Sequence, residues 1–462
     1  MIEDLHKRIW ELSPYVQTQE SYRELTELTA DLIKLYDLQD RLSHDPFGPT
    51  RERKLSLPVE TIYAKLKNCT CVVTGGLGCV GSMLVKELLK FDVKAIIILD
   101  TKINGQFVGS EKVVYLSCDI RQLHRVHEIF DVYRPDFVFH TAAQRDPGRA
   151  ESHIAETVST NVVGTLNVVK ACEAVGTVKQ MVFSSTGKAS RYFTQEVYAS
   201  TKKMDEFILD TYARKSDVCY SMVRFTHILD NSLMNEELKN ESKTGDYLAV
   251  HSPGKYVTAQ NAHEAAYLIL NALVYSTPKQ CSFLLVRHLE WPVESLAMAL
   301  YYIKESDRAI PVVFIGNPVG YTEKFFRGQM DWSEPAELNL LTNVYERKYR
   351  RLNHEKDIII SRVCSTDESI LDEVLVAIEK ITGEEEMKEV LINGLRRMVR
   401  RSLKEVNPKD TIDILRWGLD PRLLEMENAR VSDFGAIILL LVESLANSEY
   451  YREAEGLLYQ QA

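Results

Sequence analysis

The sequence has no pair of cysteines at the spacing of a zinc or iron–sulfur site. Its eight cysteines are scattered, and the closest two, Cys69 and Cys71, form only C-x-C, which on a strand turns both side chains to one face. Cys118 and Cys172 lie in apolar stretches, where a free cysteine behaves as a small hydrophobic residue. We therefore expect no metal site, and the lack of a disulfide framework favours a reducing compartment.

Long apolar runs are also missing. The most apolar stretch, Phe434 to Val442, is far shorter than the ~20 residues of a membrane span and predicts a buried helix. The first residues, Met1 to Leu5, lack the basic segment and apolar run of a secretory signal. These features predict a cytoplasmic protein that does not bind membranes.

Charge of one sign is not concentrated in the chain. The 462 residues carry a formal net charge of −10 at pH 7, and 45% of them are hydrophobic. A net negative charge does not attract nucleic acid, so we expect no nucleic-acid partner. Basic runs such as Arg396–Arg401 lie near acidic clusters such as Glu384–Glu386, and we interpret them as solvated helix faces.

What the sequence does contain, from about residue 66, is a regular alternation of short apolar runs with helical segments. Val/Ile-rich runs separated by helices predict a parallel sheet covered on both faces, which is a doubly wound Rossmann α/β fold. The predicted strands are Thr70–Thr74, Ala95–Leu99, Val113–Ser117, Phe137–Thr141, Gln180–Ser184 and Cys219–Arg224.

A glycine-rich turn follows the first predicted strand. Gly75, Gly78 and Gly81 have the spacing G-x-x-G-x-x-G and are followed by a helical segment. In a dinucleotide site this turn must be tight and the backbone must approach the pyrophosphate, and side chains would obstruct both. The free N–H groups at the start of the helix then face the phosphates. The pattern predicts a dinucleotide-binding site.

Acidic residues follow the next two predicted strands. Asp100 comes about 20 residues after the glycines, where a carboxylate accepts hydrogen bonds from ribose hydroxyls and repels a 2′-phosphate. This position favours NAD, although the nearby Lys102 offsets part of the repulsion and leaves NADP open. Asp119, followed by Ile120, stands where an acidic residue reaches the adenine amino group; a loop or helix-capping aspartate is an equally good interpretation.

A tyrosine and a lysine four residues apart follow the fifth predicted strand. Tyr198 and Lys202 share one helix face, where a cationic lysine lowers the pKa of a neighbouring phenol from its usual ~10. The phenol then exchanges a proton with a substrate hydroxyl, while Thr186 or Ser185 holds the same oxygen. This pair predicts hydride transfer between a carbinol and nicotinamide.

Together these motifs resemble the extended short-chain dehydrogenase/reductases, in particular the polysaccharide-biosynthesis branch of sugar-nucleotide 4,6-dehydratases and epimerases. The resemblance covers roughly residues 66–330. The matching stretches are T-G-G-L-G-C-V-G, H-T-A-A, T-N-V-V-G-T, S-S-T-G-K-A, Y-A-S-T-K and V-R-F.

The resemblance implies roles for further residues. Asn161 is the helix asparagine that organises the lysine, and His140 and Ala142 lie beside the cofactor. Dehydrogenases of this type commonly pair through helices, so a homodimer is the default expectation. The candidate cofactor-binding residues are Gly75, Gly76, Leu77, Gly78, Cys79, Val80, Gly81, Asp100, Asp119, Ile120, His140, Ala142, Ala143 and Asn161.

The sequence departs from the family pattern in the catalytic loop. Family dehydratases read S-T-D-K-A, where the aspartate protonates the leaving hydroxyl and the lysine abstracts a proton. Here Gly187 replaces the aspartate, while Lys188 remains. Because a glycine cannot act as a general acid, ordinary dehydration requires an acid from elsewhere, such as Asp146 or a water molecule.

Substrate-binding loops differ as well. The family's L-R-P-G-E-K loop is replaced by residues 317–324, which lack the arginine that resembles a diphosphate clamp. Arg145, Arg149 and Arg191 are candidate replacements. His227 replaces a family asparagine and is either a substrate contact or a loop histidine.

Three hypotheses about function follow. The first is an NAD(P)-dependent redox enzyme that oxidises or reduces a carbinol of a sugar-like small molecule, or does so transiently within an epimerisation. The second is a sugar-nucleotide 4,6-dehydratase, and the third is a non-catalytic cofactor-binding scaffold. The predicted parts are a helical N-terminal extension with a linker (1–65), an NAD(P)-binding Rossmann domain (66–230), a smaller α/β substrate-binding part (231–335) and a helical C-terminal extension (336–462).

Overall fold

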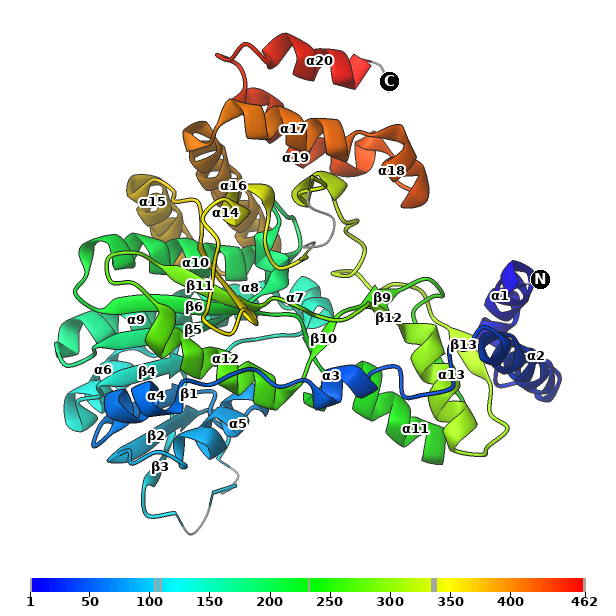
Figure 1. Cartoon of the computed structure of the whole chain (residues 1–462), viewed down its shortest axis with the longest axis horizontal. Coiled ribbons are helices and arrows are strands. Elements are labelled where there is room, and N and C mark those ends of the chain that lie inside the picture. Colours follow the sequence, from blue (N-terminus) through cyan, green and yellow to red (C-terminus); the bar gives the residue numbers. More distant parts are fainter. Residues whose placement is uncertain (1, 104–105, 108–109, 232, 334–338, 460–462) are drawn as a thin grey trace. The chain divides into compact units, whose positions relative to one another are not determined.

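The chain divides into two compact units, each assembled from separate stretches of sequence (Figure 1). The computed structural model describes residues 2–103, 106–107, 110–231, 233–333 and 339–459. Unit 1 comprises Met1–Lys54, Thr226–Ala265 and His288–Pro318, and unit 2 comprises Leu55–Phe225, Ala266–Arg287 and Val319–Ala462. The division into four consecutive parts made from the sequence stays a prediction, and its boundary at 335 lies outside the described residues.

Unit 2 is built on a mostly parallel sheet, which has nine strands among the described residues, in the order β14-β15-β11-β6-β5-β4-β1-β2-β3. All six predicted strands are confirmed, with ends shifted by at most two residues. They are β1 (Thr70–Thr74), β2 (Ala95–Asp100), β3 (Val113–Ser117), β4 (Phe137–His140), β5 (Gln180–Thr186) and β6 (Cys219–Phe225).

Helices cover both faces of this sheet. Parallel crossovers are right-handed, so the face on which a connection lies depends on the direction in which the next strand is added. The connection from β1 to β2, which carries α5, runs in one direction and lies on one face. The connections from β3 to β4, β4 to β5 and β5 to β6 run in the opposite direction and lie on the other face. On that second face α6 contacts α9, and α9 contacts α10. The bounds are α5 (Cys79–Leu88), α6 (Leu123–Tyr133), α7 (Pro147–Ser152), α8 (Ile154–Val158), α9 (Gly164–Val175) and α10 (Val197–Lys215), and α4 (Val59–Leu66) precedes β1.

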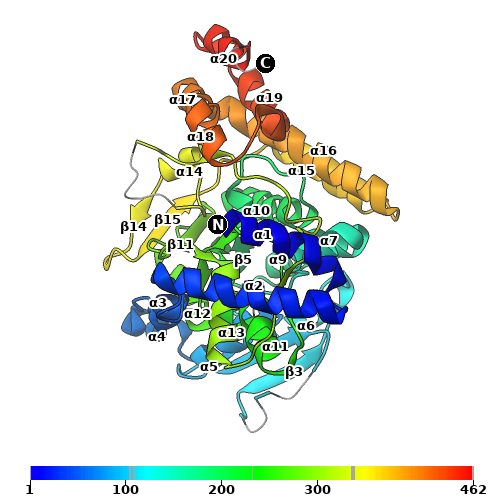
Figure 2. The same ribbon diagram turned by 90° about the vertical axis from the view of Figure 1, so that its right-hand side faces the viewer.

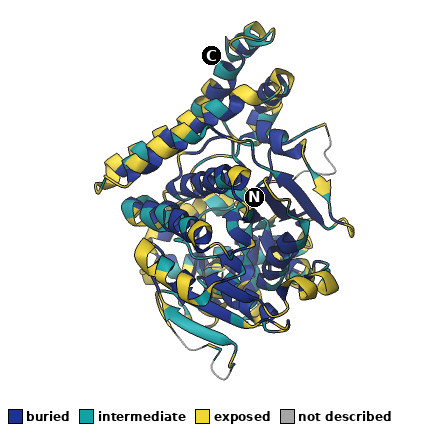
Figure 3. Cartoon of the chain, turned by 90° about the vertical axis from the view of Figure 1, so that its left-hand side faces the viewer, coloured by how far each residue is buried: buried dark blue, intermediate teal, exposed yellow. Residues whose placement is uncertain are grey.

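Burial follows this layering. The central strands β1 and β4 are buried along their whole length, whereas the edge strand β3 is only partly buried (Figure 3). Strands that are covered on both faces need apolar side chains at every position, which is why they appear in the sequence as continuous apolar runs.

Two further strands lie in the stretch 336–462, which was expected to be helical. β15 (Ile358–Arg362) pairs antiparallel with β11 (Ser282–Val286), and β14 (Arg351–Leu352) pairs antiparallel with β15. The β-branched run Ile358-Ile359-Ile360 explains why this segment forms a buried strand. The sheet is therefore parallel except at this edge.

The C-terminal part of unit 2 is otherwise helical, as expected. α15 and α16 pack closely. A Cβ at Gly394 would lie 2.6 Å from Val374 Cγ1, so the glycine is what allows the two helices to approach. Acidic residues occupy the first turn of α16 and basic residues the last, which complements the helix dipole. The helices are α14 (Val344–Arg347), α15 (Glu368–Ile378), α16 (Glu384–Ser402), α17 (Pro408–Gly418), α18 (Pro421–Met426), α19 (Gly435–Ser444) and α20 (Tyr451–Tyr459).

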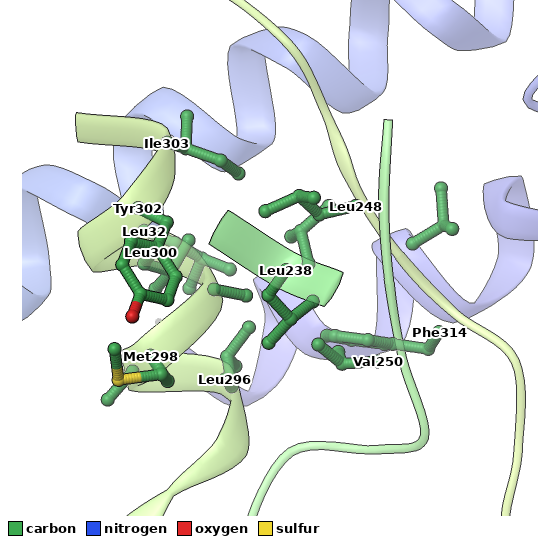
Figure 4. Close-up of a cluster of buried hydrophobic side chains, with 14 of the residues drawn as sticks. Leu32, Leu238, Leu248, Val250, Leu296, Met298, Leu300, Tyr302, Ile303 and Phe314 are labelled. Atoms are coloured by element: carbon green, nitrogen blue, oxygen red, sulfur yellow. The ribbon is translucent and has the colours of Figure 1, made fainter. Parts of the chain in front are cut away.

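Unit 1 has its own core beneath two N-terminal helices. α1 (Ile2–Leu12) and α2 (Gln19–Leu38) lie side by side (Figure 2), and Arg8 bridges to Glu24 at 2.6 Å. Their apolar faces meet Leu248 and neighbouring side chains in one buried cluster (Figure 4). The other elements of unit 1 are α3 (Gly48–Glu52), β7 (His227–Ile228), α11 (Leu238–Thr244), β8 (Leu248–Val250), β9 (Tyr256–Val257), β10 (Ala259–Gln260), β12 (Val293–Glu294), α13 (Ser295–Glu305) and β13 (Val312–Phe314), and α12 (Ala262–Tyr275) crosses from unit 1 into unit 2.

Helix side chains also complete the short sheet of unit 1. The backbone N–H of Val312 donates to Thr29 Oγ1, and that of Phe314 donates to Ser13 Oγ, both at 2.9 Å. These hydroxyls satisfy N–H groups that β13 does not use in its pairing with β8, so the helices are joined to the strands by hydrogen bonds as well as by apolar contact. No helix among the described residues is long and apolar enough to cross a membrane.

Candidate active site

The glycine turn lies at the carboxyl end of β1, next to the end of β4. Gly75 has φ +67°, and a Cβ there would stand 2.7 Å from the backbone nitrogen of Ala142. A Cβ on Gly81 would collide with the carbonyl oxygen of Gly75. Gly78 caps α5, so the N–H groups that begin this helix face the same turn. This is the cradle that a dinucleotide pyrophosphate requires, and the residues present fit such a group.

The residues at the start of α5 line the mouth of this cradle. Leu77, Cys79 and Val80 are all partly exposed, while Gly76 is buried against Ile98. The Asp100 carboxylate, at the end of β2, accepts a hydrogen bond from the Leu77 backbone N–H at 3.2 Å. An anionic acceptor therefore stands where the sequence predicted it, beside the turn.

Asp119 is engaged by its own loop. Its carboxylate accepts hydrogen bonds from the Arg121 side chain at 2.9 and 3.0 Å and from the Arg121 backbone N–H at 3.0 Å. These bonds lower the pKa of Asp119. Ile120 is buried, and its carbonyl accepts from Asn167 at 3.0 Å. The geometry favours the loop interpretation of Asp119 over adenine recognition.

The His140 side chain lies in the core and does not face the cofactor cradle. It is fully buried, and its two ring nitrogens lie 2.6 Å from Thr74 Oγ1 and 3.0 Å from Thr165 Oγ1. Burial lowers the pKa of His140 to about 3, so the ring is neutral. The residues that do follow β4 at the edge of the cradle are Ala142 and Ala143, which are partly exposed.

Asn161 ties the loop after β4 to the helix that carries the Tyr/Lys pair. It lies in a π-helical turn, η2 (Ser159–Val163), a feature often found at functional sites. Its Oδ1 accepts from the Gln144 backbone N–H at 2.8 Å, and its Nδ2 donates to the Gln144 carbonyl and to Thr201 Oγ1, both at 3.0 Å. Asn161 thus positions the residue next to Lys202 instead of touching the lysine itself.

Of the two hydroxyls expected to hold substrate, only Thr186 faces the site. Successive side chains on β5 point to opposite faces. Thr186 lies close enough to Tyr198 to lower the pKa of its phenol. Ser185 is buried on the other face and donates to Glu206 Oε1 at 2.6 Å. Ser185 therefore belongs to a structural network, which corrects the expectation that it is interchangeable with Thr186.

That network centres on a fully buried arginine. Arg224 Nη2 lies 2.6 Å from Glu206 Oε2 and 2.7 Å from Glu346 Oε1. Its Nη1 donates to Glu346 Oε2 at 2.7 Å and to the Leu341 carbonyl at 3.0 Å. A buried guanidinium with two carboxylates is neutralised and fully hydrogen-bonded, and through Ser185 it fixes the strand that carries Thr186.

The Tyr198/Lys202 pair is present, but its electrostatics differ from the expectation. Burial raises the pKa of Tyr198 to about 12, although the neighbouring Thr186 hydroxyl and the charge of Arg145 oppose this rise. Burial lowers the pKa of Lys202 to about 8, against the opposing effect of Asp205, which lies 3.7 Å from Lys202 Nζ. Desolvation dominates the pKa of the phenol, and the cation that opposes it is Arg145 and not the expected Lys202, so Tyr198 is a proton donor at neutral pH.

Lys188 forms part of an ion cluster. Its Nζ lies 2.6 Å from Glu196 Oε2 and 3.2 Å from the Gly320 carbonyl. Arg191 lies 3.1 Å from the same Glu196 oxygen and 2.7 Å from Glu323 Oε2. Burial lowers the pKa of Lys188, with Glu196 opposing that effect. Lys188 and Arg191 therefore share the nearby carboxylate of Glu196, and Arg191 is also held by Glu323 from a distant part of the chain.

The remaining candidates have structural surroundings of their own. Arg149 bridges to Glu156 at 2.9 Å, and Asp146 caps α7. Arg145 is close enough to Tyr198 for its charge to act on the phenol. His227 lies in β7 of unit 1, paired in register with Ala259.

Sequence reasoning missed Asp205, Glu196 and Glu323. Asp205 follows Lys202 by three residues, so helical spacing could have identified it as a neighbour. Glu323 lies more than a hundred residues after Glu196, and the two carboxylates meet only because both contact Arg191. No local pattern reveals this arrangement.

Residues 71–326, more than half of the chain, match the polysaccharide biosynthesis protein family. The chain belongs to this family. It is 24% identical over 347 residues to the capsular polysaccharide biosynthesis protein CapD of Staphylococcus aureus, covering 68% of this chain and 56% of that protein. It is 25% identical over 321 residues to the probable polysaccharide biosynthesis protein EpsC of Bacillus subtilis, covering 66% and 51%. The chain thus spans little more than half the length of these relatives.

The family relationship extends to enzymes of sugar-nucleotide chemistry. Over 216 residues the chain is 26% identical to a dTDP-glucose 4,6-dehydratase of Neisseria meningitidis, covering 44% of this chain and 58% of that enzyme. Among solved structures, Pen from Bacillus thuringiensis superposes with a TM-score of 0.56 at 22% identity, covering 64% of this chain and 88% of Pen. The epimerase Mth375 of Methanothermobacter thermautotrophicus gives 0.51 at 19% identity, covering 57% and 86%. These structures confirm the Rossmann-type fold.

Gly187 distinguishes this chain from the dehydratase pattern in space as well as in sequence. A Cβ at this position would lie 2.9 Å from Leu341 Cγ. The space in which an aspartate side chain would begin is therefore occupied by a residue from beyond the region matched to the family. The site combines a dinucleotide cradle, a phenol with a threonine partner and a buried lysine, and it has no carboxylic acid at the dehydratase position.

Proposed function

We propose that this protein is an NAD-dependent enzyme that oxidises or reduces a carbinol of a nucleotide-linked sugar, alone or as the reversible step of an epimerisation. The observation that carries the proposal is the position of Thr186 beside the Tyr198 phenol, whose pKa it lowers, with Lys202 one helical turn beyond Tyr198. The sugar nucleotide is supported by the family and by relatives named as dTDP-glucose 4,6-dehydratases and a UDP-glucose 4-epimerase.

The proposed roles follow from the positions of the groups. Gly75 and Gly81 leave the backbone open to the pyrophosphate, and Asp100 accepts hydrogen bonds from the ribose hydroxyls, which favours NAD over NADP. Nicotinamide, when bound, accepts or returns a hydride. Thr186 holds the substrate oxygen, and Tyr198 donates a proton to it or takes one from it.

Lys202 stabilises the charge that develops on the phenol during this exchange. The lysine is almost completely buried, at 3% exposure of its side chain, and its Nζ lies 4.0 Å from the centre of the Phe183 ring. In such a poorly solvated place its charge acts strongly on a phenolate nearby. A general acid for water elimination is missing at position 187, so we propose redox chemistry and not dehydration.

The test is to incubate the purified chain with NAD and UDP-N-acetylglucosamine, UDP-glucose or dTDP-glucose, and to follow the sugar by mass spectrometry and NMR. We expect an isomer of unchanged mass or a product lighter by two hydrogens. A product lighter by one water would show dehydration instead, and no conversion of any of the three would contradict a sugar-nucleotide substrate.

The matched variants are Tyr198→Phe and Tyr212→Phe, both on α10. Loss of the proton-transferring phenol is expected to lower kcat by about 10²–10⁴-fold in Tyr198→Phe, whereas Tyr212→Phe is expected to keep the activity. NADH binding, measured by fluorescence, is expected to persist in both. If Tyr198→Phe retained full activity, the chain would bind a cofactor without using this phenol in catalysis.

A further inference from the structure

Helix α16 packs against the helix that carries the Tyr/Lys pair, although it lies outside residues 71–326, which match the family (Figure 1). It contacts both α10 and α8. Glu384 and Lys388 stand near its start, four residues apart, so their side chains share one face of the helix. Each of them makes a hydrogen bond to an element that supports the candidate active site.

Lys388 acts on the start of α10. Within the described structure this helix has no cap of its own, because the Glu196 side chain makes no capping hydrogen bond and the first turn carries no acidic residue. The Val197 backbone N–H donates instead to Glu151 Oε1, at 2.7 Å. Glu151 belongs to α7, and its Oε2 accepts from Lys388 Nζ, also at 2.7 Å. The carboxylate that caps α10 is therefore held by α16.

Burial makes α10 depend on this contact. The Glu151 side chain is only 7% exposed, and a carboxylate in such a place needs a cation, which Lys388 supplies. Without the cation the carboxylate would turn toward water or take up a proton, and its hydrogen bond to the Val197 N–H would weaken. We therefore expect the start of α10 to loosen when residue 388 loses its charge.

Glu384 acts on the same helix through α8. The residue before α8 makes no capping hydrogen bond in the described part of the chain, and the Ala155 backbone N–H donates to Glu384 Oε2 at 2.8 Å. α8 runs directly into the π-helical turn η2, whose Asn161 donates to Thr201 Oγ1 at 3.0 Å. One turn of α16 is thus connected to α10 at two places, Val197 and Thr201.

Both of these places adjoin the Tyr/Lys pair. Val197 directly precedes Tyr198, and Thr201 directly precedes Lys202. A helix that is held at two points one turn apart can neither rotate about its axis nor slide along it without breaking a hydrogen bond. A displacement of about 1 Å at a reacting group is enough to lower a rate about 100-fold, so this restraint bears on the reaction.

We propose that α16 positions the Tyr/Lys pair of α10, with Lys388 and Glu384 as positioning residues. Lys388 acts through the Glu151 carboxylate that caps α10, and Glu384 acts through α8 and Asn161. The proposal rests on the proposed function, because the position of the pair matters to the reaction only if the phenol transfers a proton.

Hydrogen exchange of the full chain, followed by mass spectrometry, tests the two connections without any substrate. In Lys388→Met we expect the peptide that contains Val197 to exchange at least about tenfold faster than in the native protein. Arg400→Met is the matched control, because Arg400 also lies on α16 and bridges to another helix, at 2.8 Å from Glu443 on α19. It should leave the exchange at Val197 unchanged. Native exchange in a folded Lys388→Met variant would overturn the proposal.

Activity then separates positioning from stability. Lys388→Met is expected to lower kcat about 10–100-fold and to change the KM for the sugar nucleotide less than about twofold, because alignment and not binding is lost. Lys388→Arg keeps the ion pair and should restore kcat. Full kcat in Lys388→Met would refute the positioning role even if exchange were faster.

A second variant keeps the test decisive if Lys388→Met does not fold. Glu384→Ala removes only the contact to α8, and it is expected to speed exchange of the peptide with Ala155 and to lower kcat with little change in KM. Native exchange and native kcat in this variant would overturn the proposal. A native chain that converts none of the sugar nucleotides would instead refute the proposed function, and the exchange rates would still decide whether α16 holds α10.

Discussion

Replacing Arg224 with methionine tests the link between the buried ion network and the fold of unit 2. Arg224 has no exposed surface, and its side chain makes five hydrogen bonds, four of them to Glu206 and Glu346 and one to the Leu341 carbonyl. Methionine fills much of the same volume but removes the guanidinium that bonds both carboxylates and leaves Lys203 as the cation that acts on them. Removing one partner of a buried ion pair costs about 3–5 kcal/mol, and we expect a loss of free energy of unfolding in that range.

Arg416 provides the matched control. It also meets two carboxylates, with contacts of 2.7 and 3.0 Å to Glu453 and 2.6 Å to Asp413, but its side chain is 45% exposed. Surface pairs of this kind contribute about 0–1 kcal/mol, because water solvates the separated charges nearly as well. Comparing Arg224→Met with Arg416→Met therefore separates the contribution of burial from that of the hydrogen bonds, which have similar lengths at the two positions.

The assay is guanidinium denaturation of both variants at several pH values. In the native protein, burial raises the pKa of Glu206, but Arg224 more than offsets this, and the net pKa is lowered. The ionised Glu206 therefore stabilises the fold at neutral pH, and this contribution is lost as the pH falls through the lowered pKa. In Arg224→Met the carboxylates can be neutralised by protons, and the deficit relative to the native protein should shrink at acidic pH. If Arg224→Met cost no more than Arg416→Met at pH 7, the account of the network would be wrong.

Two further predictions concern the site. Because burial lowers the pKa of Lys202 to about 8, kcat/KM should fall above that pH as the lysine loses the charge that stabilises the phenolate. The Lys202→Arg variant keeps its charge, so its pH profile should lack this fall. Gly187→Asp should not restore dehydration and should cost about 1–3 kcal/mol by overpacking against Leu341. The double variant with Leu341→Ala should recover part of the lost thermal stability. Mass spectrometry of the sugar should show no loss of water in Gly187→Asp alone. A dehydrated product from Gly187→Asp alone would contradict the steric argument.

Much of unit 2 could be predicted because its signals are local. Strands buried on both faces must be apolar at every position, so β1, β2 and β4 appear as runs, and the motif residues follow from the ends of these runs. The strands β14 and β15 were missed, because a single short run at Ile358–Ile360 lies among helical segments and its partner β11 is far away in the sequence.

The electrostatics of the site could not be predicted in the same way. Tyr198 and Lys202 were placed correctly on one helix, but the direction of the Tyr198 pKa shift depends on burial by residues distant in the sequence, which no local pattern reveals. Ser185 was a different kind of error. The alternation of side chains along a strand already separates it from Thr186, so the sequence contained enough information to reject it as a substrate contact.

The position of Glu346 affects how the chain is made. Arg224 and Glu346 are 122 residues apart, and β15 covers the edge of β11 only after that interval has been synthesised. A ribosome therefore releases the dinucleotide-binding strands long before the second carboxylate and the covering strand emerge. Until then the nascent sheet has an open edge, and Arg224 lacks the second carboxylate that completes its hydrogen bonds, a state prone to pairing with other chains. A chaperone that shields nascent sheets should associate with this chain until about residue 362 has left the exit tunnel.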